Sequence, residues 1–119
     1  DVNWLPLERL KESNAVLADF RWYEGAIKTL RRARELGIPA VLDADLTPEG
    51  LNEDVISSAT HVLFSQPALK EFAAGKSTEK ALNYAVELNR GWVGVTEGSG
   101  GTSWLDKGSL RHSPAFEVK

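Results

Sequence analysis

Four short apolar runs, separated by segments with helical spacing, limit this chain to one kind of fold. The runs cover residues 15–18, 40–42, 61–64 and 92–95. Runs of this length between polar residues are typical of buried strands rather than helices. Between the first two runs, residues 24–36 place apolar side chains at helical spacing, and Gly37 and Pro39 then end the helix. Strand, crossover helix and strand together predict a parallel βαβ unit.

The rest of the chain extends this unit. Further helices are expected over residues 5–13, 51–59, 68–74 and 77–88. Beyond residue 95 the spacing of apolar residues changes. An antiparallel hairpin is expected from residues 102–106 and 109–112, and one more strand from residues 115–118. We therefore expect a single α/β domain over residues 1–119. It has a parallel sheet with crossover helices plus a C-terminal antiparallel hairpin extension.

The composition narrows the range of functions. With 42% hydrophobic and 26% charged residues the chain is expected to fold. Its net charge of −3 argues against nucleic acid or an anionic membrane as the main partner, and no apolar run approaches the roughly 20 residues of a membrane span. The absence of cysteine excludes disulfides and zinc–thiolate sites and fits a cytoplasmic location. The densest basic cluster, which is expected to be a solvated helix face, is Lys28, Arg31, Arg32 and Arg34.

Polar side chains end all four apolar runs. The residues that follow them directly are Asp19, Asp43, Ser65 and Thr96, and the loops beyond add Asp45 and Gln66. Ligands of open parallel sheets bind outside the carboxyl ends of the strands, so these side chains are expected to share one edge. A glycine-rich turn that could hold a phosphate follows Thr96, and carboxylates that face such a turn indicate metal–phosphate chemistry. The alternative is that these polar strand-end residues are ordinary loop residues. Trp22 also has two interpretations, a packing residue or part of a pocket at this edge.

A glycine-rich turn follows the fourth run. Gly98, Gly100 and Gly101 carry no side chain, so successive backbone N–H groups can form a concave nest that binds an anion such as phosphate. The turn is not a P-loop, since no Gly-Lys-Ser/Thr follows, and it is not a dinucleotide fingerprint, because a strand rather than a helix comes next. His61 and His112 have no second ligand or triad partner at a useful spacing and are expected to be ordinary residues.

Two stretches resemble the ribokinase-like, or PfkB, carbohydrate kinases. They are residues 93–101, VGVTEGSGG, with the hairpin that follows, and residues 15–45, AVLADFRWYEGAIKTLRRARELGIPAVLDAD. Residues 61–69, HVLFSQPAL, make the similarity greatest to the sulfofructose kinase-like branch. The resemblance implies a ribokinase-like but incomplete domain. It also implies a parent enzyme that uses ATP and Mg²⁺ to phosphorylate a sugar hydroxyl.

The same resemblance implies roles for single residues on the nucleotide side. Thr96 and Gly98 would lie beside the ATP phosphates, and Gly101 would keep the turn tight. Many members carry an Asn-x-x-Glu motif that organises magnesium and phosphate. The four corresponding residues, which begin with Ser65 and Gln66, lack both the Asn and the Glu. Ser65 and Gln66 are therefore expected to contact the nucleotide, while organisation of a metal by this loop is in doubt.

The chain contains fewer of the residues expected on the sugar side of the site than on the nucleotide side. Asp19 and Asp43 are the residues expected there. The family's catalytic Gly-Ala-Gly-Asp segment would follow the strand at residues 115–118 and is absent, as is the half that supplies much of the sugar site. The chain also begins without a methionine, which fits an excised segment. No catalytic residue or metal ligand is therefore assigned, and the 119 residues alone are not expected to phosphorylate a sugar.

Three interpretations remain open. The first is a central fragment of an ATP-dependent carbohydrate kinase with part of the nucleotide site, whose parent binds a nucleotide and a small sugar. The second is a non-catalytic α/β domain that forms homo-oligomers through an exposed sheet edge, since unpaired edges invite strand pairing. The third is a phosphoacceptor domain with Asp43 as the acceptor. It ranks last because Glu97, rather than a lysine, follows Thr96.

Overall fold

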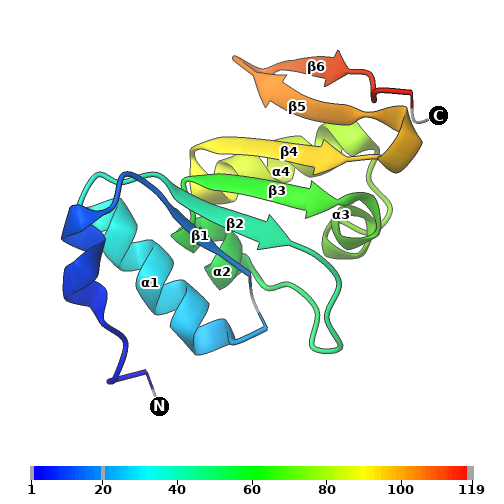
Figure 1. The fold of residues 1–119 in the computed structure, drawn as a ribbon. Helices are drawn as coiled ribbons and strands as arrows, with labels where there is room; N and C mark the ends of the chain where they lie inside the picture. The colour runs from blue at the N-terminus through cyan, green and yellow to red at the C-terminus, as the bar shows by residue number, and fades with distance from the viewer. Residues whose placement is uncertain (1, 20, 118–119) are drawn as a thin grey trace.

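A single six-stranded sheet forms the centre of the molecule (Figure 1). This computed structural model describes residues 2–19 and 21–117. The strands lie in chain order, and they are β1 (Val16–Ala18), β2 (Ala40–Ala44), β3 (His61–Ser65), β4 (Trp92–Thr96), β5 (Thr102–Asp106) and β6 (Ser109–Ser113). The first four are parallel, and β5 and β6 are antiparallel. The predicted fold class is confirmed.

The helices pack on one face of this sheet. They are α1 (Tyr23–Glu35), α2 (Glu53–Ser58), α3 (Gln66–Phe72) and α4 (Thr78–Asn89), with short 3₁₀ helices η1 (Leu7–Glu12) and η2 (Gly98–Gly100). Right-handed crossovers between strands that follow one another in the same direction place every connecting helix on the same side. Alternate strand residues accordingly form the core beneath the helices: Leu42, Val62, Phe64, Val93 and Val95 are fully buried.

The sequence of α1 explains which face of this helix is buried and where the helix ends. Leu30 and Ala33 are fully buried and face the sheet. Gly37 adopts φ +75° directly after the helix, and the amide of Ile38 donates to the carbonyl oxygen of Ala33 over 2.9 Å. A left-handed residue that satisfies the last free carbonyls is the usual way a helix ends. The helix predicted over residues 24–36 is therefore confirmed to within one residue at each end.

Capping residues explain where the shorter helices begin. Asn52 accepts a hydrogen bond from the amide of Val55, so α2 starts two residues later than expected. Ser65 accepts one from the amide of Ala68, and Pro67 suits the first turn, so α3 starts two residues earlier. Ser77 caps α4 by accepting a hydrogen bond from the amide of Lys80. No helix within the described part of the chain is long and apolar enough to cross a membrane.

Three expectations need correction. The segment 5–13 forms a 3₁₀ helix rather than an α-helix, because its six residues bury no side chain that could stabilise a longer element. Residues 115–117 are not a strand, since Pro114 lacks an N–H for the sheet and the chain turns away there; Val118 lies outside the described residues. Asp43 lies inside β2 rather than after it, because pairing with β3 continues to Ala44.

Arg34 is also not part of a solvated face as predicted. Its guanidinium donates to the carbonyl oxygens of Ala59 and Asn89, each over 2.8 Å. These carbonyls stand at the carboxyl ends of α2 and α4, where helices leave acceptors unsatisfied and carry partial negative charge. Arg34 therefore joins three helices at the edge of the sheet opposite the expected ligand site.

Candidate functional site

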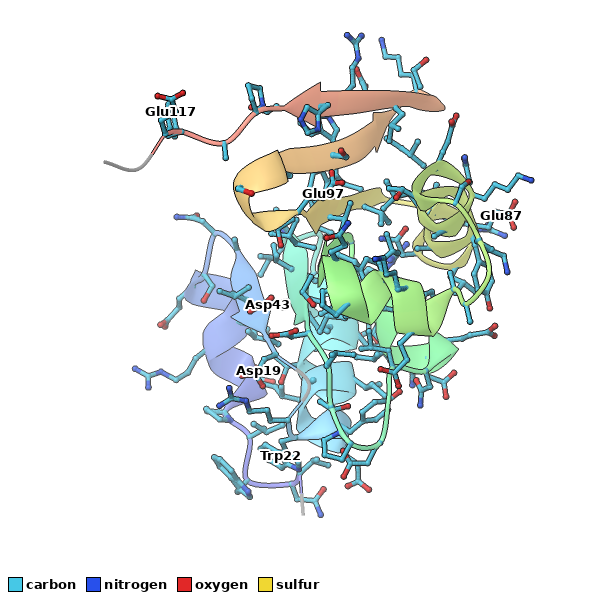
Figure 2. The ribbon with its side chains drawn as sticks, turned by 90° about the vertical axis from the view of Figure 1, so that its right-hand side faces the viewer. Asp19, Trp22, Asp43, Glu87, Glu97 and Glu117 are labelled. Carbon is cyan, nitrogen blue, oxygen red and sulfur yellow. The ribbon has the colours of Figure 1, made fainter. Side chains whose placement is uncertain are left out.

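The carboxyl ends of β1 to β4 meet at one edge of the sheet, onto which Figure 2 looks. Asp19 follows β1, and Asp43 lies near the end of β2 on the neighbouring strand. Ser65 and Thr96 are the last residues of β3 and β4 and stand opposite each other in the register. The structure therefore brings the predicted strand-end residues to a common edge.

Asp45 lies in the loop after β2 and belongs to the same edge of the sheet. Its Oδ1 accepts hydrogen bonds from the Ser65 hydroxyl at 2.7 Å and from the amide of Leu46 at 2.8 Å. The Ser65 hydrogen bond first, then the Leu46 amide and the charge of Arg21, lower the pKa of Asp45 below its ordinary value. Asp45 is thus an ionised carboxylate tied to the start of α3. Its alternation with Asp43 along the chain was the signal available in the sequence.

The glycine turn closes largely on itself. The amides of Gly100 and Gly101 donate to the carbonyl oxygens of Glu97 and Gly98 at 2.9 and 3.1 Å, and the amide of Glu97 donates to Gly101 at 2.7 Å. Among the described residues, the amides of Gly98 and Ser99 have no acceptor, and both residues are exposed. The turn therefore offers two adjacent N–H donors to an anion, a smaller nest than the glycine count predicts.

Gly101 has a packing role of its own. It adopts φ +92°, and a Cβ atom there would lie 2.1 Å from the carbonyl oxygen of Ser113 and 2.9 Å from the Cα of Pro114. Only glycine allows the segment after β6 to pass this close to the turn. Its expected contact with a nucleotide stays a prediction.

The carboxylate of Glu97 anchors the turn to the hairpin. The buried Ser103 hydroxyl donates to Glu97 Oε1, and it lies 2.9 Å from Nδ1 of His112. His112 Nδ1 is also 3.9 Å from the same carboxylate oxygen. Because the serine stands between the histidine and the carboxylate, this is not the order of a hydrolytic triad, in which the histidine is central. The spacing of the sequence gives no partner for His112, because no spacing rule links a turn residue to a hairpin.

Two hollows lie at opposite ends of this edge. The one beside the turn has a volume of about 60 Å³ and is lined by residues that include Gln66, Lys70 and Glu97. The other has a volume of about 370 Å³ and is lined by Arg21, Tyr23, Glu49, Gly50 and Asn52. Binding sites for small ligands usually enclose at least about 300 Å³, so the hollow at the turn is too small to enclose a whole nucleotide.

The acidic residues do not gather around the turn. Within residues 2–19 and 21–117, no three acidic or histidine side chains come together as a metal site. The carboxylate of Asp19 instead accepts a hydrogen bond from the amide of Arg21 at 3.1 Å. Trp22 is a packing residue: its ring lies against Gly25 and stacks on Trp4 with 5.4 Å between centroids. The edge thus has a phosphate-sized end at the turn and a polar hollow near β1 and β2.

Comparisons with known proteins agree with this arrangement. No protein-family model matches the chain. A crystal structure of a protein from Agrobacterium tumefaciens assigned as a ribokinase is 31% identical, with a TM-score of 0.84, and the match covers 95% of this chain and 38% of that one. A PfkB protein from Polaromonas has a TM-score of 0.82 at 17% identity, covering 96% of this chain and 44% of its own.

A third solved structure is the Arabidopsis thaliana ribokinase complexed with ribose and ATP. It has a TM-score of 0.77 at 18% identity, and the match covers 91% of this chain and 37% of that enzyme. The chain therefore spans about two fifths of the length of the kinases that it matches. Over about 95% of its own length, it has the fold of the ribokinase/PfkB carbohydrate kinases.

Proposed function

We propose that this chain is a segment of an ATP-dependent carbohydrate kinase and forms one wall of its nucleotide site. The observation that carries the proposal is the exposed pair of amides, Gly98 and Ser99, directly after a parallel strand in a ribokinase-like fold. Adjacent N–H donors at the carboxyl end of a strand fit a phosphate group. The ATP in the Arabidopsis ribokinase, which shares this fold, supports a nucleotide as the source of that phosphate.

Each residue in and beside the turn has its own role in this proposal. Thr96 donates a long hydrogen bond of 3.4 Å to the carbonyl oxygen of Phe64, so its hydroxyl can turn toward a phosphate at small cost. Gly98 supplies a free amide, and Gly101 keeps the turn closed. Gln66 extends the surface beside the turn, where it lines the smaller hollow. Ser65 acts on the nucleotide mainly by holding Asp45 and the start of α3.

Magnesium fits this chain less well than phosphate does. Mg²⁺ in such sites is bound through one or two carboxylates together with the phosphates of the substrate. The four residues that begin at Ser65 contain no carboxylate, and the described residues hold no cluster of metal ligands. We therefore route no step through a metal held by these residues, and we place the magnesium of the parent enzyme with its nucleotide.

The sugar lies toward the other end of the edge in this proposal. Asp19 follows β1 and Asp43 lies on the neighbouring strand β2 (Figure 2), and carboxylates accept hydrogen bonds from sugar hydroxyls. Within the family we place the parent nearest to the sulfofructose kinase-like branch, on the strength of residues 61–69, and in the cytoplasm, which the lack of cysteine supports.

The isolated chain is not expected to catalyse the reaction. Phosphoryl transfer requires both substrates to be positioned and the developing charge to be stabilised. The 119 residues offer two turn amides and strand-end side chains for one of these tasks. Sugar-dependent ATP turnover by this chain alone would contradict the proposal.

Nucleotide binding by the chain can be tested directly. In a titration with ATP followed by ¹⁵N–¹H NMR, the amide resonances of Gly98 and Ser99 should shift more than those of α1. The substitution Thr96→Val should weaken binding by about three- to tenfold, since it removes one hydrogen-bond donor. The matched control, Thr29→Val on α1, should bind as the wild type does. Unchanged resonances of Gly98 and Ser99 at millimolar ATP would refute the assignment of the turn.

A second function has one observation in its favour. The sheet has two free edges, β1 and β6, because neither strand has a second neighbour among the described residues. A non-catalytic α/β domain could form homo-oligomers by pairing these edges. In that case a proline in β6, such as Leu110→Pro, would remove the association, and ATP would leave the spectrum unchanged.

A further inference from the structure

Ser103 is a buried polar residue in the middle of the hairpin. The other buried polar side chains of the described residues, Ser58 and Asn89, bond to backbone groups. The Ser103 hydroxyl instead contacts two side chains, the carboxylate of Glu97 and the imidazole of His112. A buried hydroxyl destabilises a fold unless its hydrogen bonds are made. The serine therefore points to a task for these two contacts.

The hydrogen bonds of Ser103 have a fixed direction. A carboxylate only accepts hydrogen bonds, so the one proton of the Ser103 hydroxyl is donated to Oε1 of Glu97. The serine oxygen then accepts from Nδ1 of His112, 2.9 Å away, and this nitrogen carries the ring proton. The donors thus run from His112 through Ser103 to Glu97, and they hold the carboxylate beside the hairpin (Figure 2).

Glu97 also closes the glycine turn. Its amide donates to the carbonyl oxygen of Gly101 over 2.7 Å, and its carbonyl oxygen accepts from the amide of Gly100 over 2.9 Å. Its Cβ lies 3.4 Å from the place that a Cβ on Gly100 would take, so the side chain starts directly beside the turn. The next two residues, Gly98 and Ser99, have the amides without an acceptor among the described residues. The carboxylate is therefore attached next to the donors that the proposed function gives to a phosphate.

A carboxylate and a phosphate compete for such donors. Asp and Glu side chains accept hydrogen bonds from nearby backbone amides, and these charge-assisted bonds are about twice as strong as neutral ones. An unrestrained Glu97 side chain can therefore turn toward the amides of Gly98 and Ser99. It would then occupy them and repel a phosphate by its charge.

We propose that Ser103 is a positioning residue for the glycine turn. Together with His112, it holds the Glu97 carboxylate in the hairpin and so keeps it off the two free amides. Without Ser103, Glu97 would become an internal competitor of the nucleotide. This inference rests on the proposed function, since that function assigns the amides to a nucleotide phosphate. All the contacts that carry it are made within the turn and the hairpin.

A double-mutant cycle measures this competition. Ser103→Ala should raise the dissociation constant for ATP by about five- to tenfold, because the released carboxylate occupies the amides. Glu97→Gln keeps the length of the side chain but removes its charge, and it should bind ATP at least as tightly as the wild type. The double variant should bind within about twofold of Glu97→Gln alone. A merely structural role of Ser103 predicts no such recovery, because the double variant has lost more contacts than Ser103→Ala has.

NMR spectra without nucleotide test the same step. In Ser103→Ala, the amide protons of Gly98 and Ser99 should move downfield, as expected for hydrogen bonds to a carboxylate, and adding Glu97→Gln should reverse the change. ¹⁵N NMR of the His112 ring in alkaline buffer should place the proton on Nδ1 in the wild type. This preference should weaken in Ser103→Ala, because the acceptor that fixes it is gone.

The matched control removes a similarly buried hydroxyl elsewhere. Ser58 donates to the carbonyl oxygen of Asp54 within α2, so Ser58→Ala should leave ATP binding unchanged. Circular dichroism checks that each variant is folded. If Ser103→Ala does not fold, His112→Phe removes the other end of the same chain of hydrogen bonds at a half-exposed position. It should weaken ATP binding in the same direction, and an unchanged affinity would overturn the proposal.

Two further results would overturn it. One is a folded Ser103→Ala variant whose Gly98 and Ser99 amide resonances stay unmoved without nucleotide. The other is a double variant that binds ATP no better than Ser103→Ala does. Failure of the proposed function looks different: the changes without nucleotide occur, but the wild-type chain does not respond to ATP. That result supports the hold of Ser103 on Glu97 and contradicts the nucleotide site.

Discussion

Arg34 and Asn89 are 55 positions apart, yet Nη2 of the arginine donates a 2.8 Å hydrogen bond to the carbonyl oxygen of the asparagine. The asparagine side chain is fully buried and in turn bonds Trp92 O and the amide of Gly91. The contact thus links the end of α1 to the end of α4 and the start of β4. At the edge of the sheet far from the candidate site, this one guanidinium therefore ties the ends of α1 and α4 together.

Replacing that guanidinium should destabilise the fold. We expect Arg34→Met to lower the free energy of unfolding by about 1–2 kcal/mol, since two carbonyls at helix ends lose a charged donor while the aliphatic stem is kept. Urea unfolding followed by circular dichroism measures the change. Arg31→Met, on an exposed turn of the same helix, is the control and should change stability by less than about 0.5 kcal/mol.

Gly101 should tolerate no side chain. Gly101→Ala combines a positive φ with a Cβ atom 2.1 Å from a backbone oxygen, so we expect a loss of about 2–4 kcal/mol. Gly108→Ala separates the two causes, because Gly108 has φ +82° but open space around its Cβ. It should cost only about 1 kcal/mol. Equal losses for the two variants would show that the close approach to Ser113 does not matter.

Asp45 should make the stability depend on pH in the acid range. Its pKa is lowered in the folded state, so its ionised form favours folding at pH above the unfolded value of 3.8. That contribution is lost as the pH falls through the lower, folded pKa. The difference in stability between the wild type and Asp45→Asn should therefore be present at pH 7 and shrink below pH 3.8. A difference that is the same at pH 7 and pH 2.5 would contradict the Ser65 hydrogen bond as its source.

Removing the Tyr23 hydroxyl, unlike the substitutions above, is not expected to destabilise the fold. This hydroxyl is buried and has no hydrogen-bond partner among the described residues, and burial followed by the charge of Asp54 raises its pKa. Tyr23→Phe should therefore leave stability unchanged or raise it by up to about 1 kcal/mol. The control is Tyr84→Phe, because the Tyr84 hydroxyl does donate to Glu53, and that change should lower stability. Thermal unfolding of the two variants side by side makes the comparison.

The sequence predicted most of the fold because the fold depends on local patterns. The apolar run 61–64 became β3, and Gly37 ended α1 where a glycine should. The site was less predictable, because its contacts join residues far apart in the chain. Ser65 meets Asp45 across 20 positions, and nothing in the spacing shows that Ser103 links Glu97 to His112. The role of Arg34 was missed for the same reason, since a charged residue on a helix gives no sign of the distant carbonyls that it satisfies.

The order of the strands in the sheet also bears on how the chain is made. Each strand pairs with the strand that precedes it, so no strand has to wait for a segment synthesised much later. The sheet can add β2, β3, β4 and then the hairpin one after another as the polypeptide leaves the ribosome. Such nearest-neighbour pairing keeps loop closures short and favours rapid folding. We therefore expect nascent chains that end after α4 to hold β1, β2 and β3 already paired.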